Sequence, residues 1–548
     1  MDLEPNASFD LRIHPVRKVI GNDAVRMLSY NGSIPGPTLR VQQGSEIIVN
    51  VANEGDIETT VHWHGLRLEN RYDGVPVETQ APIEIGGTFM YRVQFPDVGL
   101  YWYHPHIRED FAQEMGLSAA IVVMPDDPSY WPPCDRDMTI TLDDVLIEDG
   151  QMAPFRRSGP TFTAMGRFGN VMLTNGQEDF VAQATVGEVV RLYLVNTANT
   201  RIFNVALPGA RMKLIGGDSG RYEREEFVDE VMLSPSERAI VDVLFDRSGE
   251  VRLEHRVPDH VYELGRFQVD GSGSTAAGEI FSELRVDPAL TAERRVAESH
   301  VDRSPDKTLS FSSSMPLLYG EVESKASSYV CPMHPEVKDT EASTCPKCGM
   351  RLVPVHDEPA ARSFVCPMHP EVTDTQASTC PKCGMKLIPA DVSPPAQAET
   401  HIHDPGEMDD GLEWEDLMPE INRRTDPSNM IWTLTDPETG AVNHEISWNF
   451  KVGDLVKIRL INEMEGSDHP MHHPFHVHGA GRFLILSRDG RTESNLVWKD
   501  TVLLRAGETV DILLYVTNPG LWMAHCHIAE HTESGMMFSF RVDEREAS

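Results

Sequence analysis

The sequence predicts an all-β protein built from β-sandwich domains. Its 548 residues correspond to about three or four domains of ordinary size. Many short runs rich in Val, Ile, Thr and Tyr are separated by Gly, Pro, Asn and Asp, which is typical of sandwich strands and turns. A duplicated motif rich in Cys and His is too short to bury a core of its own, so it indicates small modules beside the sandwiches.

Shifts in composition give the domain boundaries. The first sandwich is expected at residues 1–130, the second at 131–290, a linker region at 291–425 and the third sandwich at 426–548. In the second sandwich, residues 183–196 and 231–245 show strand patterns and no clustered metal ligands. The linker region is Ser-rich at 310–314 and Pro/Ala-rich at 394–398.

Two pairs of histidines in the first sandwich are each separated by one residue. His62 and His64 end a strand run at 59–64, and His104 and His106 follow an apolar run. Side chains two residues apart on a strand share a face, so each pair can form half of a copper or zinc site. Pro105 removes a ladder donor, which places the second pair at a strand end or a bulge.

A third cluster near the C-terminus repeats the pattern. His476 and His478 form the pair, and His473 precedes them by three residues. One such pair is weak support for a metal site, but the chain holds four, counting the pair that flanks Cys526.

The fourth pair encloses a cysteine: His525, Cys526 and His527 follow an apolar strand run. Successive side chains on a strand point to opposite faces, so Cys526 points away from both histidines and toward a different metal. With His531 and Met536, it completes the soft ligand set of a blue electron-transfer copper. The alternative, a buried cysteine beside two core histidines, is disfavoured by the three other clusters.

In all four motifs the sequence resembles the three-domain, laccase-like multicopper oxidases, which consist of three cupredoxin-like Greek-key β-sandwiches. The resemblance implies four copper ions and a trinuclear cluster between the first and third sandwiches. It assigns His473, Cys526, His531 and axial Met536 to the type-1 copper, His62 and His476 to the type-2 copper, and His64, His104, His106, His478, His525 and His527 to the type-3 pair.

The resemblance also implies a reaction. A reducing substrate gives single electrons to the type-1 copper, and they pass through Cys526 to His525 and His527. Four electrons then reduce O2 to two waters at the trinuclear cluster. The axial thioether of Met536 predicts a low to medium reduction potential.

The sequence indicates the acidic residues that deliver protons less clearly than it indicates the metal ligands. Asp73 resembles the acid that feeds protons to the cluster in relatives, although it can equally be an ordinary Asp-Gly turn residue. Many bacterial relatives carry a glutamate directly after the second type-1 histidine, where this chain has Thr532. Glu530 or Glu533 can substitute for it.

The linker region contains two near-identical segments, at 329–354 and 364–389, offset by 35 residues. Their expected ligands are Cys331, His334, Cys345 and Cys348 in the first, and Cys366, His369, Cys380 and Cys383 in the second. Such Cys₃His sets are typical of structural zinc. The segments also resemble the heavy-metal-binding modules of copper and silver efflux proteins, and nearby methionines suit Cu(I). Two further Zn²⁺ or Cu⁺ ions are therefore expected, with the choice of metal left open.

Charge and composition exclude some classes. A net charge of −37 disfavours nucleic acid as a partner. The sequence contains no run of eighteen apolar residues, so no transmembrane segment is predicted. The N-terminus lacks the features of a signal peptide, so we expect either a mature, extracytoplasmic form with its signal removed or a cytoplasmic enzyme.

The acidic run at 407–420 is either a solvated segment or a cation-collecting patch. Cys134, outside every motif, is expected to be a small buried hydrophobe.

Three functions follow. The chain can be an oxidase of a metal ion, with Cu(I) favoured over Fe(II) or Mn(II), to which the linker modules deliver metal. It can be a laccase-like oxidase of phenols or aromatic amines, with modules that are structural or regulatory. The alternative from another class is a copper- or zinc-sequestering resistance protein in which oxidase turnover is secondary, although sequestration needs no trinuclear cluster.

Overall fold

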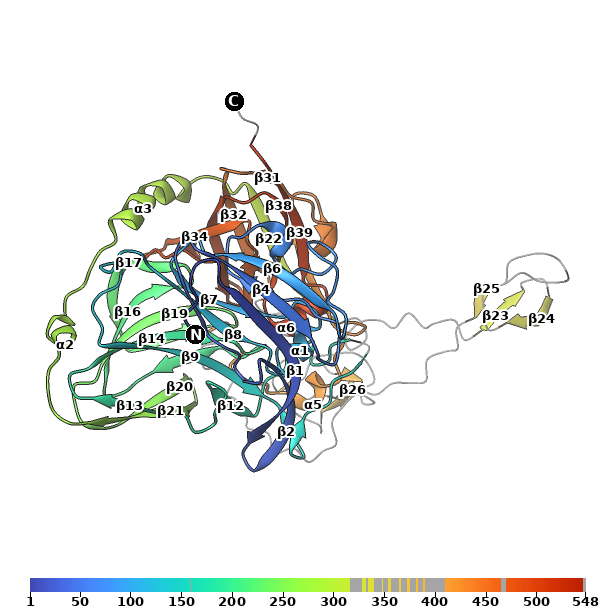
Figure 1. Ribbon diagram of the computed structural model, residues 1–548. Coiled ribbons are helices and arrows are strands. Elements are labelled where there is room, and N and C mark those ends of the chain that lie inside the picture. Colours follow the sequence, from blue (N-terminus) through green and yellow to red (C-terminus); the bar gives the residue numbers. More distant parts are fainter. Residues whose placement is uncertain are drawn as a thin grey trace. The chain divides into compact units, whose positions relative to one another are not determined.

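The computed structural model describes residues 1–157, 159–315, 410–464 and 470–545, with short stretches between 328 and 389. The chain divides into two compact units, one of Met1–Ser313, Asp409–Leu417 and Trp432–Ser548, the other of Ser314–Met408 and Met418–Ile431. Strands dominate the larger unit, as the predicted all-β class requires (Figure 1). No helix among the described residues is long and apolar enough to cross a membrane.

The first sandwich consists of two four-stranded sheets. One has the order β2-β1-β4-β6, with β1 Ser8–Ile20, β2 Asp23–Tyr30, β4 Glu46–Asn53 and β6 Thr88–Gln94. The other has the order β3-β8-β7-β5, with β3 Leu39–Gln42, β8 Ala119–Met124, β7 Gly99–His104 and β5 His62–His64. Alternate residues of β1, such as Leu11 and Ile13, are buried and share one core with Val41, Trp63 and Tyr101 of the second sheet.

The second sandwich pairs a six-stranded with a five-stranded sheet. The first has the order β12-β9-β14-β19-β16-β17, with β9 Arg136–Val145, β12 Val171–Thr174, β14 Val189–Asn196, β16 Arg211–Gly217, β17 Gly220–Val228 and β19 Arg238–Leu244. The other has the order β13-β21-β20-β15-β18, with β13 Val181–Thr185, β15 Phe203–Ala206, β18 Glu230–Leu233, β20 Gly249–Val257 and β21 His260–Asp270. The runs predicted at 183–196 and 231–245 are thus two strands each, separated by short turns.

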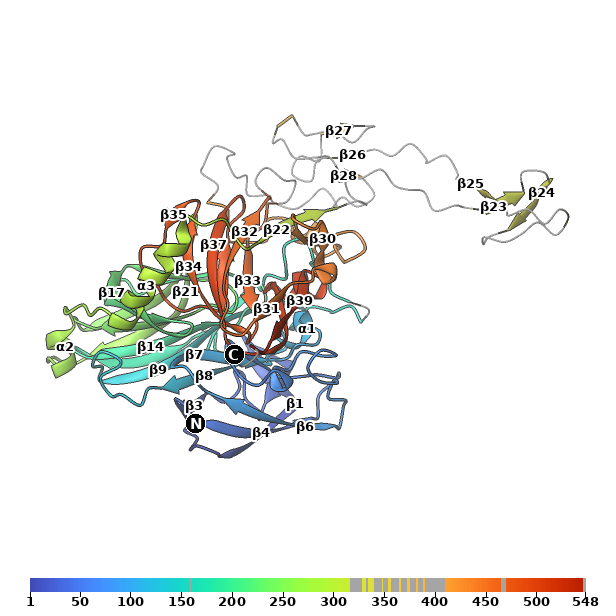
Figure 2. The same ribbon diagram turned by 90° about the horizontal axis from the view of Figure 1, so that it is seen from above.

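Strand β14 shows why part of this sequence reads as one continuous apolar run. Leu192 and Leu194 face the core of the second sandwich, while Tyr193 and Val195 pack against Leu100 and neighbouring residues of the first. Every residue of β14 is therefore buried. Figure 2 shows β7 and β8 lying beside β9 and β14.

The third sandwich pairs a seven-stranded with a five-stranded sheet. The first has the order β30-β29-β22-β32-β37-β34-β35, with β22 Lys307–Ser314, β29 Ile431–Asp436, β30 Ala441–Val442, β32 Leu455–Asn462, β34 Gly481–Arg488, β35 Arg491–Thr492 and β37 Thr509–Val516. The other has the order β31-β39-β38-β33-β36, with β31 Asn449–Lys451, β33 His473–Val477, β36 Thr501–Leu504, β38 Gly520–Cys526 and β39 Met537–Asp543.

Part of the predicted linker region belongs to this sandwich. The Ser-rich run forms β22, which pairs in parallel with β32 and buries Leu309 and Phe311. The longest helix, α3 Pro288–Val301, covers β34 with Leu290 and Ala297. Leu309 and Phe311 lie on the same face of the strand, and burial of these two side chains anchors it although the run is rich in serine.

The remaining elements are short. In the larger unit they are β10 Ile147–Glu148, β11 Gln151–Met152, α1 Glu109–Ala112, α2 Ala276–Ile280, α6 Ala529–Glu533 and the 3₁₀ turns η1 Asn70–Tyr72 and η3 Asn443–Glu445. The smaller unit contains the three-stranded sheets β24-β23-β25 and β27-β26-β28, with β23 Ser328–Cys331, β24 His334–Asp339, β25 Val353–Val355, β26 Phe364–Val365, β27 Thr373–Asp374 and β28 Ile388–Pro389, and helix α5 Pro419–Asn422.

Candidate metal centre

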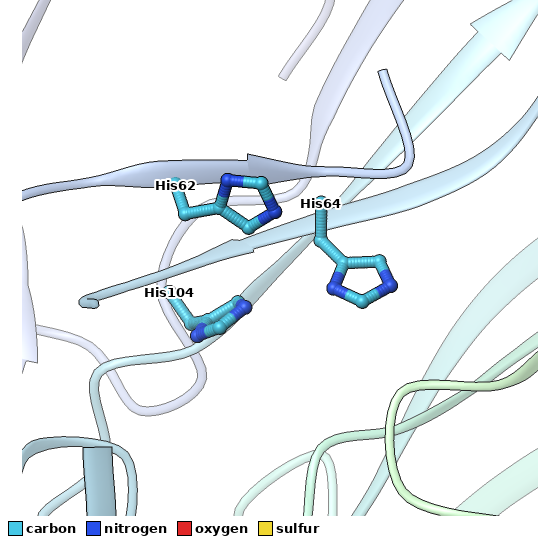
Figure 3. Close-up of side chains that lie close together, drawn as sticks. All are labelled: His62, His64 and His104. Carbon is cyan, nitrogen blue, oxygen red and sulfur yellow. The ribbon is translucent and has the colours of Figure 1, made fainter. Parts of the chain in front are cut away.

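Strand register brings the paired histidines together. In the first sandwich, β5 pairs with β7 so that His62 lies opposite His104. In the third, β33 pairs with β38 so that His476 lies opposite His525. Strand β7 ends at His104, as expected from the proline that follows. Figure 3 shows the imidazoles of His62, His64 and His104 close to one another.

All eight paired histidines form one buried cluster between the first and third sandwiches. None is more than 5% exposed. The rings of His62 and His478 are 4.1 Å apart, and those of His64 and His476 are stacked at 3.7 Å. His527 lies 4.9 Å from His64 and 5.2 Å from His104, ring centre to ring centre. Residues more than 370 positions apart in the chain thus share one site.

Three ring nitrogens in this cluster face each other. The Nε2 atom of His478 lies 3.3 Å from that of His106 and 3.1 Å from that of His525. The Nδ1 atom of each ring faces an oxygen that accepts its proton: Asp73 Oδ2 for His478, Glu109 Oε1 for His106 and the Cys526 carbonyl for His525. With their protons on Nδ1, His478 and His525 present Nε2 lone pairs to each other at 3.1 Å, and a cation between them would remove the repulsion.

Three other cluster histidines also donate through Nδ1. The Nδ1 atoms of His62, His104 and His476 donate to the carbonyls of Asp73, Pro105 and Asp500, at 2.7, 2.9 and 2.9 Å. Their Nε2 atoms have no hydrogen-bond partner within the described part of the chain. Buried polar atoms without a partner are costly, so these nitrogens are suited to binding a cation. The donor set therefore fits bound copper ions.

Burial keeps most of these rings neutral, as metal ligation requires. It lowers the pKa of His62, His64, His104, His476 and His478 well below the ordinary value, that of His525 to about 3 and that of His527 to about 4. His106 differs, because Glu109 outweighs the effect of burial and raises its pKa.

A second group lies around Cys526. Its Sγ atom is 3.4 Å from Nδ1 of His473 and 3.6 Å from Nδ1 of His531. All three side chains are fully buried, as is Met536, whose carbonyl accepts the backbone N–H of Cys526. Burial raises the pKa of the thiol and lowers that of both imidazoles, so a bound cation is what would hold the sulfur as a thiolate. Trp432 packs against His531 with ring centres 4.0 Å apart and ring planes tilted by 30°.

Asp73 is a turn residue that also contacts the histidine cluster. It caps the turn η1, and Gly74 behind it has a φ of +82° with Val61 O only 2.0 Å from the position of an added Cβ. The residue is also fully buried and holds two cluster imidazoles, through its carbonyl and Oδ2. Burial raises the pKa of its carboxyl group.

Sequence reasoning missed Glu109. Helix α1 begins three residues after His106, and this spacing brings Glu109 Oε1 within 2.9 Å of His106 Nδ1. Burial opposes ionisation of Glu109, but His106 outweighs it, so that the pKa falls to about 2. An acid three residues after a histidine pair, at the start of a helix, is the signal that could have identified it.

Thr532 and the two glutamates near it differ in their hydrogen-bond partners. Thr532 Oγ1 lies 3.1 Å from Nδ1 of His525 and donates to the Cys526 carbonyl. Glu533 accepts the backbone N–H of Glu109 at 3.0 Å. Glu530 instead accepts hydrogen bonds from Asn199 and Thr200 of the second sandwich. Of the two glutamates considered as substitutes, Glu533 is thus the one hydrogen-bonded to a neighbour of the cluster.

Most of the predicted linker ligands lie outside the described residues, namely Cys345, Cys348, Cys366, His369, Cys380 and Cys383. Cys331 and His334 are on β23 and β24, where their Cα atoms are paired in the ladder. Cys134 packs against Val189 and Phe281 as a small apolar residue would, but it is half-buried and not buried as predicted.

Residues 411–416 of the acidic run are partly or fully buried. Leu412 contacts Ile202 and Leu503 in one apolar cluster that Trp414 borders. Glu415 pairs with buried Arg201 at 3.2 Å. The two apolar side chains within the run explain the difference from a solvated segment.

Comparisons with known proteins agree with this geometry. Family models described as "Multicopper oxidase" match residues 16–128 and 417–546, and one described as "Heavy metal binding domain" matches 328–355 and 364–390. The multicopper oxidase mco of Staphylococcus aureus is 23% identical over 94% of this chain and 83% of its own length.

A copper resistance protein A homolog of Pseudomonas syringae pv. tomato is 24% identical over 98% of this chain and 92% of its own. The solved multicopper oxidase from Campylobacter jejuni shares the fold, with a TM-score of 0.61 at 20% identity over 98% of this chain and 91% of that one. Together with the two buried ligand groups, these matches show that the chain is an enzyme of the multicopper oxidase family.

Proposed function

We propose that this protein couples four one-electron oxidations of a reducing substrate to the reduction of O2 to two waters. Bound copper would supply the redox chemistry, as a type-1 ion that accepts single electrons and a trinuclear group that reduces dioxygen. The observation that carries the proposal is the buried cluster of eight imidazoles, beside a separate group of His473, Cys526 and His531. Five of the eight rings have a nitrogen without a hydrogen-bond partner among the described residues, and the other three turn Nε2 toward one another.

The proposed ligands follow the sequence motifs. His473, Cys526, His531 and Met536 would hold the type-1 copper, His62 and His476 the type-2 copper, and His64, His104, His106, His478, His525 and His527 the type-3 pair. Support comes from the close groups that these side chains form, among them His473, Cys526 and His531, and His106, His478 and His525.

The chain itself provides the route between the two sites. Cys526 contacts His473 and His531 on one face of β38, while the adjacent His525 lies among the cluster histidines. His525 Nδ1 also donates to the Cys526 carbonyl at 2.8 Å, which adds a hydrogen-bonded path to the covalent one. We assign electron transfer to this short connection.

Asp73 is proposed to hold a proton at Oδ1. This oxygen has no hydrogen-bond partner among the described residues, whereas Oδ2 is occupied by His478. Burial favours the protonated carboxyl group over the ionised one, which suits a group that gives protons to reduced oxygen.

For the substrate, we favour a metal ion, and Cu(I) in particular. The support is the pair of heavy-metal-binding modules in the same chain and the name of the Pseudomonas relative, which refers to copper resistance. A phenol or aromatic amine is the second candidate, because the ligand groups do not select the electron donor.

Oxygen uptake tests the proposal. We would measure it with Cu(I), Fe(II) and a phenol, for the full chain and for a form without residues 328–390. If the modules deliver metal, the deletion lowers kcat/KM for Cu(I) and leaves phenol turnover largely intact. Equal effects on both donors, or none, would contradict delivery, and no uptake with any donor by the copper-loaded chain would contradict the oxidase itself.

A further inference from the structure

One buried carboxylate touches two of the cluster histidines. Asp500 precedes β36 and is 2% exposed. Its Oδ1 atom lies 3.0 Å from Nε2 of His64, and its carbonyl accepts the Nδ1 proton of His476 at 2.9 Å. Because a carboxylate accepts the His64 proton at Nε2, the lone pair of that ring is left at Nδ1, which has no partner among the described residues.

Asp500 is in turn held by an arginine from the second sandwich, which carries no cluster histidine. Arg238 lies on β19, and its two Nη atoms donate to the two carboxylate oxygens of Asp500, at 2.7 and 2.5 Å. Its Nε atom donates to the Leu100 carbonyl of the first sandwich at 2.8 Å. One guanidinium group therefore joins all three sandwiches at the edge of the cluster.

The geometry leaves this pair little freedom. Arg238 and Asp500 lie against the backbone just after His64, where an added Cβ on Gly65 would be 2.5 Å from Asp500 Oδ2 and 2.7 Å from Arg238 Nη2. The pair is thus packed directly on the strand that carries His62 and His64. A fork of two parallel hydrogen bonds fixes the carboxylate plane in a way that a single donor cannot.

Further charges surround the pair. Asp218 accepts the backbone N–H of Arg238 and lies 3.0 Å from Lys499 Nζ, which also pairs with Glu237 at 3.1 Å. This buried network holds two cations and three carboxylates, so that one excess negative charge lies beside the cluster. Such an excess favours cations in the neighbouring site.

We infer that Arg238 is a positioning residue for the trinuclear site. Through Asp500 it orients the rings of His64 and His476 and selects the nitrogen that each presents, so the sandwich without ligands controls copper occupancy. The inference rests on the proposed function, because it takes these two histidines as copper ligands.

The alternative is that Arg238 only joins the sandwiches. A control pair in the same sandwich separates the two possibilities. Arg191 makes the same two-bond fork to Asp242, at 2.8 and 3.0 Å, and both side chains are buried. Within the described part of the chain, no contact of that fork involves a cluster histidine. Arg191→Met should therefore reproduce the loss of a buried ion pair without touching the site.

The test compares wild type, Arg238→Met, Arg238→Lys and Arg191→Met after loading with copper. The readouts are copper content per chain, the blue thiolate absorption, the electron paramagnetic resonance signal of the non-blue copper, and thermal unfolding. For Arg238→Met we expect the blue band to persist while the affinity of the non-blue sites for copper falls roughly 10- to 100-fold. Arg238→Lys keeps the charge without the fork and should lose less copper. Arg191→Met should lose stability but retain full copper.

Other outcomes are equally clear. Lower stability of Arg238→Met with full copper content and an unchanged resonance signal would overturn the positioning role. If Arg238→Met does not fold, Arg238→Lys decides the question, because a wild-type non-blue signal in that variant would also overturn it. Absence of non-blue copper in wild type would instead refute the proposed function, so the two failures are distinguishable.

Discussion

Replacing Gly65 by alanine tests how closely the Arg238–Asp500 pair lies against the histidine strand. Gly65 has a φ of +84°, a conformation that costs an L-residue roughly 1–2 kcal/mol. The added Cβ would also lie 2.5 Å from Asp500 Oδ2, closer than real Cβ contacts. Relieving such an overlap in a packed interior costs a further ~1–3 kcal/mol.

Gly86 provides the matched control. Its φ is +80°, and no heavy atom of the described structure lies within 4 Å of its added Cβ. Gly86→Ala should therefore show the conformational cost alone, about 1–2 kcal/mol, and Gly65→Ala about 2–5 kcal/mol in total. The free energies of unfolding would be measured by urea titration of the copper-free proteins, followed by tryptophan fluorescence. Equal losses in the two variants would refute the reasoning, because the excess belongs only to the overlap.

Two other predictions concern protons. Asp73→Asn keeps an acceptor for His478 and suits the same turn, so copper content and the blue band should persist while kcat falls by roughly 10²-fold or more; unchanged kcat would leave Asp73 a turn residue only. Burial lowers the pKa of His255 to about 3, so the folded state binds fewer protons than the unfolded state below pH 6.5, and stability is lost as pH falls. Between pH 7.5 and 5 wild type should lose about 2 kcal/mol more than His255→Gln, measured by urea titration of copper-free protein, and parallel losses would contradict this assignment.

The clustering of the histidines was the part of the site most open to prediction. Histidines two residues apart on a strand share a face by geometry alone. The pairs His62 and His64, and His476 and His478, can therefore be recognised from the sequence. The opposite orientations of Cys526 and its neighbour His525 follow from the same alternation. The all-β class was predictable for a similar reason, because strand patterns recur along most of the chain.

The groups that hold the ligands were not predictable. Asp500 is 436 residues from His64, and Arg238 lies in a sandwich without ligands, so no local pattern links them. Strand β22 was not predicted either, because its Ser-rich sequence resembles a linker although two buried apolar side chains anchor it. Tertiary pairing, rather than local propensity, decides such features.

The central claim is that one cysteine connects a blue copper site to a buried cluster where dioxygen is reduced. Cys526→Ser removes the thiol that lies between His473 and His531, while leaving the eight cluster histidines in place. Absorbance and oxygen uptake of the copper-loaded variant should show that the blue band and turnover are lost together. Continued oxygen consumption without the blue band would contradict the account.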